Sequence, residues 1–171
     1  MKGYIQVYTG NGKGKTTAAL GLALRAAGAD KSVYFAQFVK GKPYSELSIL
    51  TAHITGITLK QYGRGCFIVN KPTEEDIRAA QNGLKDVAGI IERGEYDLVV
   101  LDEACIALFY HLFTIEALLD ILHRKPESVE LVITGRYAPQ ALIDAADLVT
   151  EMKEIKHYYT LGVEAREGIE Y

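Results

Sequence analysis

The sequence has little cysteine, and the two residues that it has are far apart. Cys66 and Cys105 are the only cysteines in 171 residues, and neither belongs to a CxxC pair. Disulfide frameworks and zinc ribbons need more cysteines at closer spacing, so neither class is expected. Sparse, unpaired cysteines are typical of proteins in a reducing compartment, and we expect a cytoplasmic protein.

A block of basic residues and a long apolar run are also missing. The net charge is −3, with acids and bases dispersed along the chain, which argues against a nucleic-acid partner. The longest apolar segment, 18–28, is interrupted by Arg25. It falls short of the roughly 20 residues that a membrane-spanning helix needs, so no membrane partner is expected. The first residues resemble a short strand rather than a signal peptide.

The residues present suit a single α/β domain covering 1–171. About half of the chain, 49%, is hydrophobic, and no internal repeat or low-complexity linker divides it. Short β-rich segments alternate with helical patterns, which predicts a layered α/β domain with a parallel sheet. We expect strands at 4–8, 32–39, 57–61, 97–104, 130–134 and 148–153, and helices at 15–27, 73–94, 114–124 and 138–145.

The segment 73–94 carries the clearest helix pattern. Thr73 is the expected N-cap, with Asp76 three residues later as in a capping box and with further acids in the first turn. Gly94 is the expected end. The predicted buried stripe consists of Ile77, Ala80, Leu84, Val87, Ala88 and Ile91.

Polar residues follow the predicted strands at the points where the strands end. Because the carboxyl ends of parallel strands meet at one edge of a sheet, and ligands bind in the crevice there, these residues predict a site. They are Thr9 after the first strand, Gln37, Lys40 and Gly41 after the second, Asp102 and Glu103 after the central strand, and Thr134, Gly135 and Arg136 after the next.

The segment GNGKGKT, residues 10–16, predicts a phosphate-binding loop between the first strand and the first helix. Gly10, Gly12 and Gly14 allow backbone angles that turn N–H groups toward an anion, and the following helix adds the positive end of its dipole. In such a loop the lysine, here Lys15, contacts phosphate oxygens and the hydroxyl of the next residue, Thr16, holds Mg²⁺. A glycine-rich turn with solvated lysines does not explain the helix that starts there.

Three charged residues at the same edge complete the predicted site. Asp102 follows four apolar residues and is the expected acidic partner of Mg²⁺, with Glu103 beside it, although a carboxylate capping the next helix is an alternative. Arg136 is expected to contact the polyphosphate, unless it pairs with Asp144 or Asp147. The four histidines, His53, His111, His123 and His157, share no metal-binding spacing.

The loop is one residue shorter than the usual G-x-x-x-x-G-K-[ST] pattern. Thr9 stands where the first glycine of that pattern belongs, and the loop reads G-x-x-x-G-K-T from Gly10. A β-branched residue resists the backbone angles of the missing glycine, so the turn shifts inward and tightens. We expect this loop to hold a polyphosphate without presenting its terminal phosphate for attack.

The sequence resembles the P-loop type of ATP:cob(I)alamin (corrinoid) adenosyltransferase over nearly its whole length. The segments that follow that family's pattern, in order, are GNGKGKTTAA, VYFAQFVKG, YDLVVLDE, ITGRYAPQALIDAADLVTEMKEIKH and GVEAREGIEY. The resemblance implies a three-layer, P-loop NTPase-like (RecA-like) α/β domain with a mostly parallel sheet. It also implies a transferase that uses ATP, Mg²⁺ and a reduced corrinoid to form adenosylcobalamin.

In that family the cobalt(I) of the corrinoid attacks the ribose 5′ carbon of ATP, and the intact triphosphate leaves. The metal is itself a strong nucleophile, so no catalytic serine, cysteine or histidine is needed, and the sequence presents none. Carried over to this chain, Lys15, Thr16 and Arg136 would be catalytic, acting on the departing triphosphate. The loop residues 10–16 would serve it too, and Asn11, Lys13, Thr17 and Arg25 would lie near the nucleotide.

The resemblance also implies partners, which are a flavoprotein reductase and a second copy of the chain. In relatives, aromatic residues in the segment matching YGRGCFIVN displace the lower cobalt ligand, and Phe67 is the candidate here. Many relatives fold an N-terminal extension over the corrinoid. Since the first strand is predicted to begin at Tyr4, that extension is expected to be absent.

Two other functions stay open from the sequence. An ordinary P-loop ATPase or small-molecule kinase would also place Asp102 and Glu103 after an apolar strand, with Glu103 positioning water. A non-catalytic nucleotide-binding regulator would keep the loop without the chemistry. The products distinguish them: triphosphate and adenosylated corrinoid, ADP and a phosphorylated product or phosphate, or no turnover.

Overall fold

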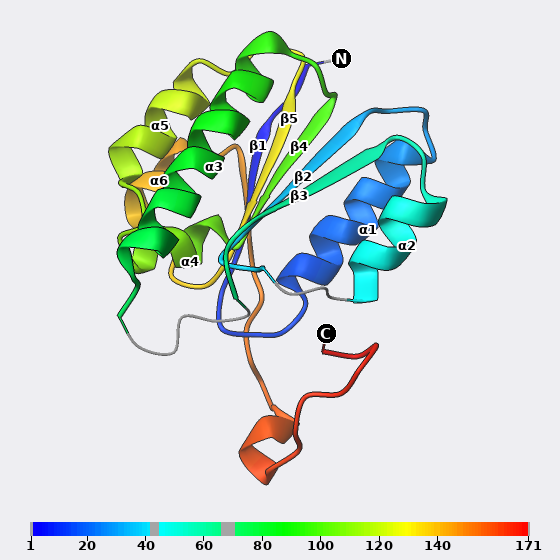
Figure 1. Ribbon diagram of the computed structural model, residues 1–171, viewed down its shortest axis with the longest axis vertical. Helices are drawn as coiled ribbons and strands as arrows, with labels where there is room; N and C mark the ends of the chain where they lie inside the picture. The colour runs from blue at the N-terminus through cyan, green and yellow to red at the C-terminus, as the bar shows by residue number, and fades with distance from the viewer. Residues whose placement is uncertain (1, 42–44, 66–70, 171) are drawn as a thin grey trace.

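The computed structural model describes residues 2–41, 45–65 and 71–170. Within these ranges the chain forms a six-stranded sheet in the order β3-β2-β4-β5-β1-β6, and every strand pair is parallel. Helices cover both faces of the sheet (Figure 1). The predicted three-layer α/β fold of the P-loop type is therefore confirmed.

The elements agree closely with the sequence-based expectations. The strands are β1 (Ile5–Thr9), β2 (Val33–Phe38), β3 (Ile57–Tyr62), β4 (Leu98–Asp102), β5 (Glu130–Thr134) and β6 (Leu148–Glu151). The helices are α1 (Lys15–Ala27), α2 (Ser45–His53), α3 (Glu74–Arg93), α4 (Ala104–Phe109), α5 (Ile115–His123) and α6 (Gln140–Ala145), followed by a 3₁₀ turn, η1 (Tyr158–Leu161).

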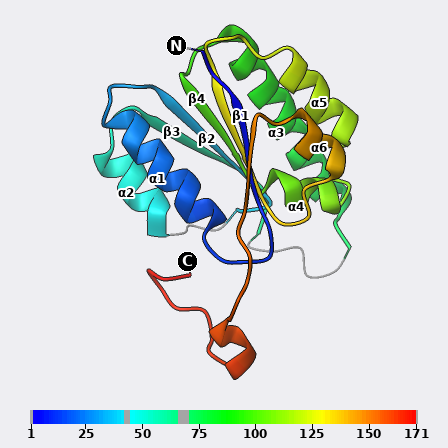
Figure 2. The ribbon, with the colours of Figure 1, turned by 180° about the vertical axis from the view of Figure 1, so that it is seen from behind.

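The two faces of the sheet pack against different helices. Helices α1 and α2 lie on one face, and α3 to α6 lie on the other, as the front and back views show (Figures 1 and 2). In β2, Val33 and Phe35 belong to the α1 side of the core, whereas Tyr34 and Ala36 belong to the α3 side. Side chains of a strand alternate between faces, so a strand covered on both faces reads as a continuous apolar run.

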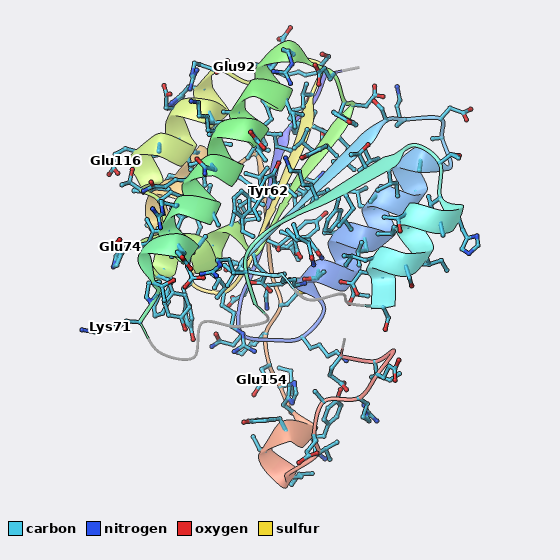
Figure 3. All side chains as sticks on the ribbon, in the orientation of Figure 1. Tyr62, Lys71, Glu74, Glu92, Glu116 and Glu154 are labelled. Atoms are coloured by element: carbon cyan, nitrogen blue, oxygen red, sulfur yellow. The ribbon has the colours of Figure 1, made fainter. Side chains whose placement is uncertain are left out.

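Helix α3 begins and ends as predicted. The Thr73 side chain accepts a hydrogen bond from the Asp76 backbone N–H, and the Asp76 side chain accepts one from that of Thr73, which is a complete capping box. Gly94 ends the helix with a φ of 61°. Figure 3 shows Glu74 and Glu92 pointing outward from this helix. Within the predicted stripe, Ala80, Leu84, Val87 and Ile91 are buried, and Ile77 and Ala88 are partly buried.

Helices α2 and α4 were not predicted from the sequence. Helix α2 has a weak apolar stripe, with Leu50 as its only buried residue, so its periodicity gives little signal. Helix α4 is six residues long and nearly all buried, so it reads as a continuation of the strand before it. Within the described ranges, no helix combines the length and the apolar character that crossing a membrane requires.

The last described segment, residues 152–170, leaves the body of the molecule after β6 and is called the returning segment below. Beyond this exposed edge strand, the chain passes Glu154, forms η1 below the sheet and turns back (Figures 1 and 3). The two ribbon views agree that its end returns toward the start of α1. The carboxyl edge of the sheet, the loop before α1 and this returning segment therefore share one region.

Candidate functional site

The predicted strand-end residues converge at the carboxyl edge of the sheet. Among the described residues, the buried polar or charged side chains are Thr9, Lys15, Gln37, Asp102 and Thr134, and all of them lie at this edge. Burying a polar group is costly unless it is hydrogen-bonded. Their concentration at one edge therefore indicates a built site rather than chance burial.

The glycine loop closes on the side chain of Lys15. The Lys15 ammonium donates to the backbone carbonyl oxygens of Gly10 at 2.8 Å and Gly12 at 2.6 Å. Gly10 and Gly14 take φ angles of 95° and 116°, which other residues rarely adopt. Burial lowers the pKa of Lys15. The ammonium thus lies inside the tight loop that its spacing predicts.

Gly12 is needed for a different reason from the predicted one. Its φ is not positive, and its N–H donates to the Met152 carbonyl at 2.6 Å instead of pointing at an open anion position. A Cβ at this position would lie 2.7 Å from the same carbonyl oxygen. The close approach of the chain after β6 is what excludes a side chain here.

The start of α1 has no internal cap. Its N-cap residue is Gly14, no side chain caps it in the described structure, and its first turn holds no acidic residue. The first N–H groups of a helix have no acceptor within the helix, so they are available to an anion. Thr16 and Thr17 of this first turn line the adjacent cavity.

Asp102 joins three elements at the base of the site. Its Oδ1 accepts hydrogen bonds from the hydroxyls of Thr16 at 2.9 Å and Thr134 at 2.7 Å, and its Oδ2 pairs with the Lys40 ammonium at 3.1 Å. Burial alone would lower the pKa of Lys40, but the Asp102 carboxylate outweighs it and the pKa is raised. Asp102 does not cap α4, whose N-cap is Glu103, so the capping alternative finds no support.

Glu103 lines the cavity in an uncommon backbone conformation. Its φ is 58°, and its backbone N–H donates to the Thr134 hydroxyl at 3.0 Å. Burial raises the pKa of its carboxyl group, and the neighbouring Asp102 charge raises it further. Positive φ in a non-glycine residue is strained and persists where the surroundings fix it, which is common at functional sites.

The donors near Asp102 suit a hard divalent cation. Magnesium prefers carboxylate, hydroxyl and phosphate oxygens and keeps several waters. The Lys40 ammonium lies 3.1 Å from Asp102 Oδ2 and 3.5 Å from Thr16 Oγ1, so a positive charge already sits between those two oxygens. Thr16, Asp102 and Glu103 therefore form a donor set that fits Mg²⁺. No group of three or more histidine, cysteine or acidic residues suited to a metal occurs in the described ranges.

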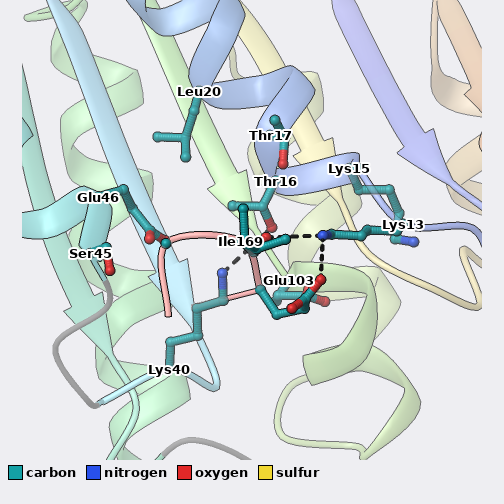
Figure 4. Close-up of a pocket in the computed structure, with 13 residues that line it drawn as sticks. Lys13, Lys15, Thr16, Thr17, Leu20, Lys40, Ser45, Glu46, Glu103 and Ile169 are labelled. Carbon is teal, nitrogen blue, oxygen red and sulfur yellow. Dashed lines mark hydrogen bonds and ion pairs between the residues drawn. The ribbon is translucent and has the colours of Figure 1, made fainter. Parts of the chain in front are cut away.

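A cavity of about 430 Å³ opens at this edge (Figure 4). Five parts of the chain form it: the loop and first turns of α1, the residue Lys40 after β2, the start of α2, Glu103 after β4, and the returning C-terminal segment. Its lining residues are Lys13, Gly14, Lys15, Thr16, Thr17, Leu20, Lys40, Ser45, Glu46, Glu103, Gly168, Ile169 and Glu170. A cavity of this size is in the range that small ligands occupy.

The remaining predicted residues differ in where they lie. Asn11 is exposed in the loop. Arg136 is exposed too, and it forms no ion pair with Asp144 or Asp147 in the described structure. Burial is the largest cause of the raised pKa of Glu103 and of the lowered pKa of Lys15, and the Arg136 charge opposes the first shift and adds to the second. Arg136 therefore lies near the site.

Arg25 is not brought to the loop. It occupies the last turn of α1, ten residues after Lys15. At a rise of 1.5 Å per residue, this is about 15 Å along the helix. Burial raises the pKa of Tyr8, and the Arg25 charge opposes that rise. Phe67, with Cys66 and Ile68, lies outside the described residues.

The structure places at the cavity several residues to which no sequence pattern assigns a role. Lys40 was noticed at a strand end, but its pairing with Asp102 requires the neighbouring positions of β2 and β4. Ser45 and Glu46 come from the unpredicted α2. The C-terminal residues carried one usable signal, since GVEAREGIEY is part of the family pattern.

Comparisons with known proteins identify the family of the chain. The model of the family described as ATP:corrinoid adenosyltransferase BtuR/CobO/CobP matches residues 1–171. The corrinoid adenosyltransferase CobA of Salmonella typhimurium is 37% identical over 175 residues, covering 99% of this chain and 86% of that protein.

Other relatives give the same result. The corrinoid adenosyltransferase of Escherichia coli K12 is 34% identical over 171 residues, covering 99% of this chain and 86% of its own length. That of Pseudomonas aeruginosa is 33% identical, covering 99% and 84%. With a family match along the full sequence and relatives above 30% identity, the chain belongs to the ATP:corrinoid adenosyltransferase family, a family of transferases.

Proposed function

We propose that this chain transfers the 5′-deoxyadenosyl group of ATP to the cobalt(I) of a reduced corrinoid. The cobalt electron pair forms the new bond to the 5′ carbon, the bond from that carbon to the triphosphate oxygen breaks, and the triphosphate leaves with the electron pair of the broken bond. One observation carries the proposal. A glycine loop closed by Lys15 and followed by an uncapped helix opens into a cavity that includes no histidine or cysteine among its described residues.

The protein would then act by orienting its substrates and stabilising negative charge. Lys13, Lys15 and Lys40 line the cavity, and Arg136 lies near it. Cations and backbone N–H groups fixed in advance stabilise a departing anion without reorganising during the reaction. Asn11 and Thr17, beside these cations, would contact the same phosphates, and Arg25 would reach another part of the nucleotide.

Mg²⁺ would be held by Thr16, Asp102 and Glu103. When bound, it would neutralise part of the triphosphate charge. Lys40, which already pairs with Asp102, would shift toward the phosphates when the divalent ion takes its place.

The partners follow from the family. A flavoprotein reductase would supply the electron that produces cobalt(I), and Phe67 would displace the lower cobalt ligand beforehand. We propose one domain over residues 1–171 that works as a homodimer in the cytoplasm. A reducing compartment would keep Cys105, which is buried, as a thiol.

An anaerobic assay tests the proposal. The protein is mixed with ATP, Mg²⁺ and chemically reduced cobalamin, the cobalamin spectrum is followed, and the phosphate product is identified. We expect adenosylcobalamin and intact triphosphate in equal amounts. ADP and phosphate without adenosylation would instead support an ATPase or kinase, and ATP binding without turnover would support a regulator. The family match favours neither alternative.

A further inference from the structure

The end of the described chain, residues 168–170, lines the cavity that we propose for the nucleotide phosphates. Gly168, Ile169 and Glu170 are among the lining residues, opposite the first turn of α1. Figure 4 shows Ile169 near Lys13, with dashed lines to the lysine ammonium. The chain therefore places part of itself where a ligand would bind.

Lys13 holds this segment by its charge. Its ammonium lies 2.8 Å from Glu170 Oε1 and 2.9 Å from the Ile169 carbonyl oxygen, and it also contacts the Tyr158 hydroxyl at 3.3 Å. Lys13 comes from the glycine loop, at the position between two glycines. The loop cation that would face a phosphate thus faces a carboxylate.

The Glu170 carboxylate is well satisfied although its segment is exposed. Its Oε2 accepts the Arg166 backbone N–H at 2.8 Å and the Arg166 Nε at 3.3 Å, and Tyr158 donates to its Oε1. Its side chain is 16% exposed. Hydrogen bonds from Arg166, Lys13 and Tyr158 lower its pKa, so the group stays charged.

The rest of the returning segment is weakly anchored. Ile155 is 84% exposed, and Tyr159 and Leu161 of the turn η1 are each 74% exposed. Little apolar surface is buried between this segment and the body of the domain, so packing contributes little to holding it there. Hydrogen bonds to Met152 hold the start of the segment, and the contacts with Lys13 hold Tyr158, Ile169 and Glu170 and depend on charge.

Placing both the Glu170 carboxylate and a triphosphate beside the Lys13 ammonium costs free energy. Both are anions seeking the same ammonium, and like charges at close range repel. Filling the cavity with a polyphosphate would release Lys13 from Glu170, and the segment would lose the attachment described above.

We propose that residues 166–170 are an internal competitor for the phosphate site, with the Glu170 carboxylate standing in for a phosphate on Lys13. This proposal rests on the proposed function only in placing the phosphates at the loop. The competitor keeps the loop cations paired when no nucleotide is bound. It also weakens binding of the triphosphate product, because the Glu170 carboxylate competes with the product for the Lys13 ammonium.

Calorimetric titration with inorganic tripolyphosphate and Mg²⁺ tests the competition. Glu170→Gln removes the competing charge, so it should bind tripolyphosphate about three- to tenfold more tightly than the unmodified chain, since a larger share of molecules is open. Glu167→Gln is the matched control. It removes the same charge three residues earlier, where no ion pair or side-chain hydrogen bond is made in the described structure, and it should bind as the unmodified chain does.

A second background separates direct competition from general repulsion. With Lys13→Ala present, Glu170→Gln should no longer tighten binding, because the shared ammonium is gone. Hydrogen exchange gives an independent readout. The Ile169 and Glu170 amides, which donate to the Arg166 carbonyl, should exchange faster when tripolyphosphate is bound.

Three results would overturn the proposal. Equal or weaker binding by Glu170→Gln would reject competition while leaving the phosphate site intact, and weaker binding would identify the segment as a clamp. Tightening of the same size in the Lys13→Ala background would reject the shared ammonium. Failure of every protein to bind tripolyphosphate would reject the phosphate site itself, and the proposal with it.

Discussion

Helices α1 and α3 begin in opposite ways. At the start of α3, Thr73 and Asp76 exchange hydrogen bonds, and the first turn carries Glu74, Glu75 and Asp76. At the start of α1, the N-cap residue is Gly14 and no acidic residue occupies the first turn. The ammonium group of Lys15, the first residue of the helix, lies inside the loop that precedes it. The positive end of one helix is neutralised by its own residues, and that of the other is left open beside further cations.

The difference separates a structural helix end from a functional one. Free N–H groups at a helix start are satisfied by side chains, by water or by a ligand. A complete capping box stabilises the helix and leaves nothing for an anion, whereas an uncapped start gives up that stability. The uncapped start of α1 lies beside the cavity, which indicates that its free N–H groups serve a ligand.

Lys15→Ala should have the largest effect on the open end. We expect adenosyl transfer to fall by about 100- to 1000-fold, because a fixed cation at the leaving group is lost. Folding should persist, since in the described part of the chain the ammonium donates hydrogen bonds to two carbonyls of its own loop and to no other element. Anaerobic transfer rates and thermal unfolding measure both. Lys85→Ala, on the exposed side of α3, should change neither, and near-normal transfer by Lys15→Ala would contradict the assignment.

Asp102→Asn tests the base of the site against the opposite end of the same strand. It removes the carboxylate charge that pairs with the mostly buried Lys40, so unfolding by urea should require about 3 kcal/mol less, and the Mg²⁺ dependence of transfer should weaken. Asp97→Asn, just before β4, breaks a partly exposed pair with Lys31 and should cost less than about 1 kcal/mol. Equal costs would show that Lys40 and Asp102 are not a buried pair.

Thr17→Glu would make the start of α1 resemble that of α3. A carboxylate near the positive helix end should leave the melting temperature unchanged or raise it, while its charge in the cavity should raise the KM for ATP about tenfold. Ala18→Glu is the matched control, because it puts the same charge in the same turn on a residue that does not line the cavity. A similar rise in KM for both variants would mean that the helix end, rather than the cavity, responds.

Thr73→Ala removes the cap of α3 and should cost about 1 kcal/mol of stability without altering transfer. Hydrogen bonds from Thr73 lower the pKa of Asp76 below its ordinary value of 3.8. The stability from this pair is therefore present above that value and lost as the pH falls through the folded pKa. In urea unfolding, the free energies of unfolding of the unmodified chain and of Thr73→Ala should converge at low pH. Thr114→Ala, at the α5 cap where Ala117 replaces the acid, should show no such convergence.

Much of the fold was predictable because its signals are local. Helix α1 was predicted at its observed bounds, 15–27, and the capping box of α3 was predicted from the spacing of Thr73 and Asp76. The parallel sheet was predictable because strands alternate with helices along the sequence. The sheet brings the strand-end residues together as expected. Helices α2 and α4 were missed because α2 has a weak apolar stripe and α4 is only six residues long, with four of the six buried.

The site was less predictable where residues meet across long distances. The sequence indicated Asp102 but not its pairing with Lys40, 62 residues away. It indicated Gly12 for a positive φ, whereas the approach of Met152 is the actual constraint. Arg25 stays far from the loop along α1, and the role of Phe67 stays a prediction.

The sequence alone determined the six strands, four of the helices and the loop at 10–16, because the alternation of strands with helices, the helix caps and the glycine spacing are local patterns. The tertiary structure decided which charges share a cavity. Lys40 meets Asp102 because β2 and β4 are neighbours in the sheet, and Glu170 meets Lys13 because the chain turns back after β6. Contacts of this kind depend on strand order and chain path, which no local pattern encodes.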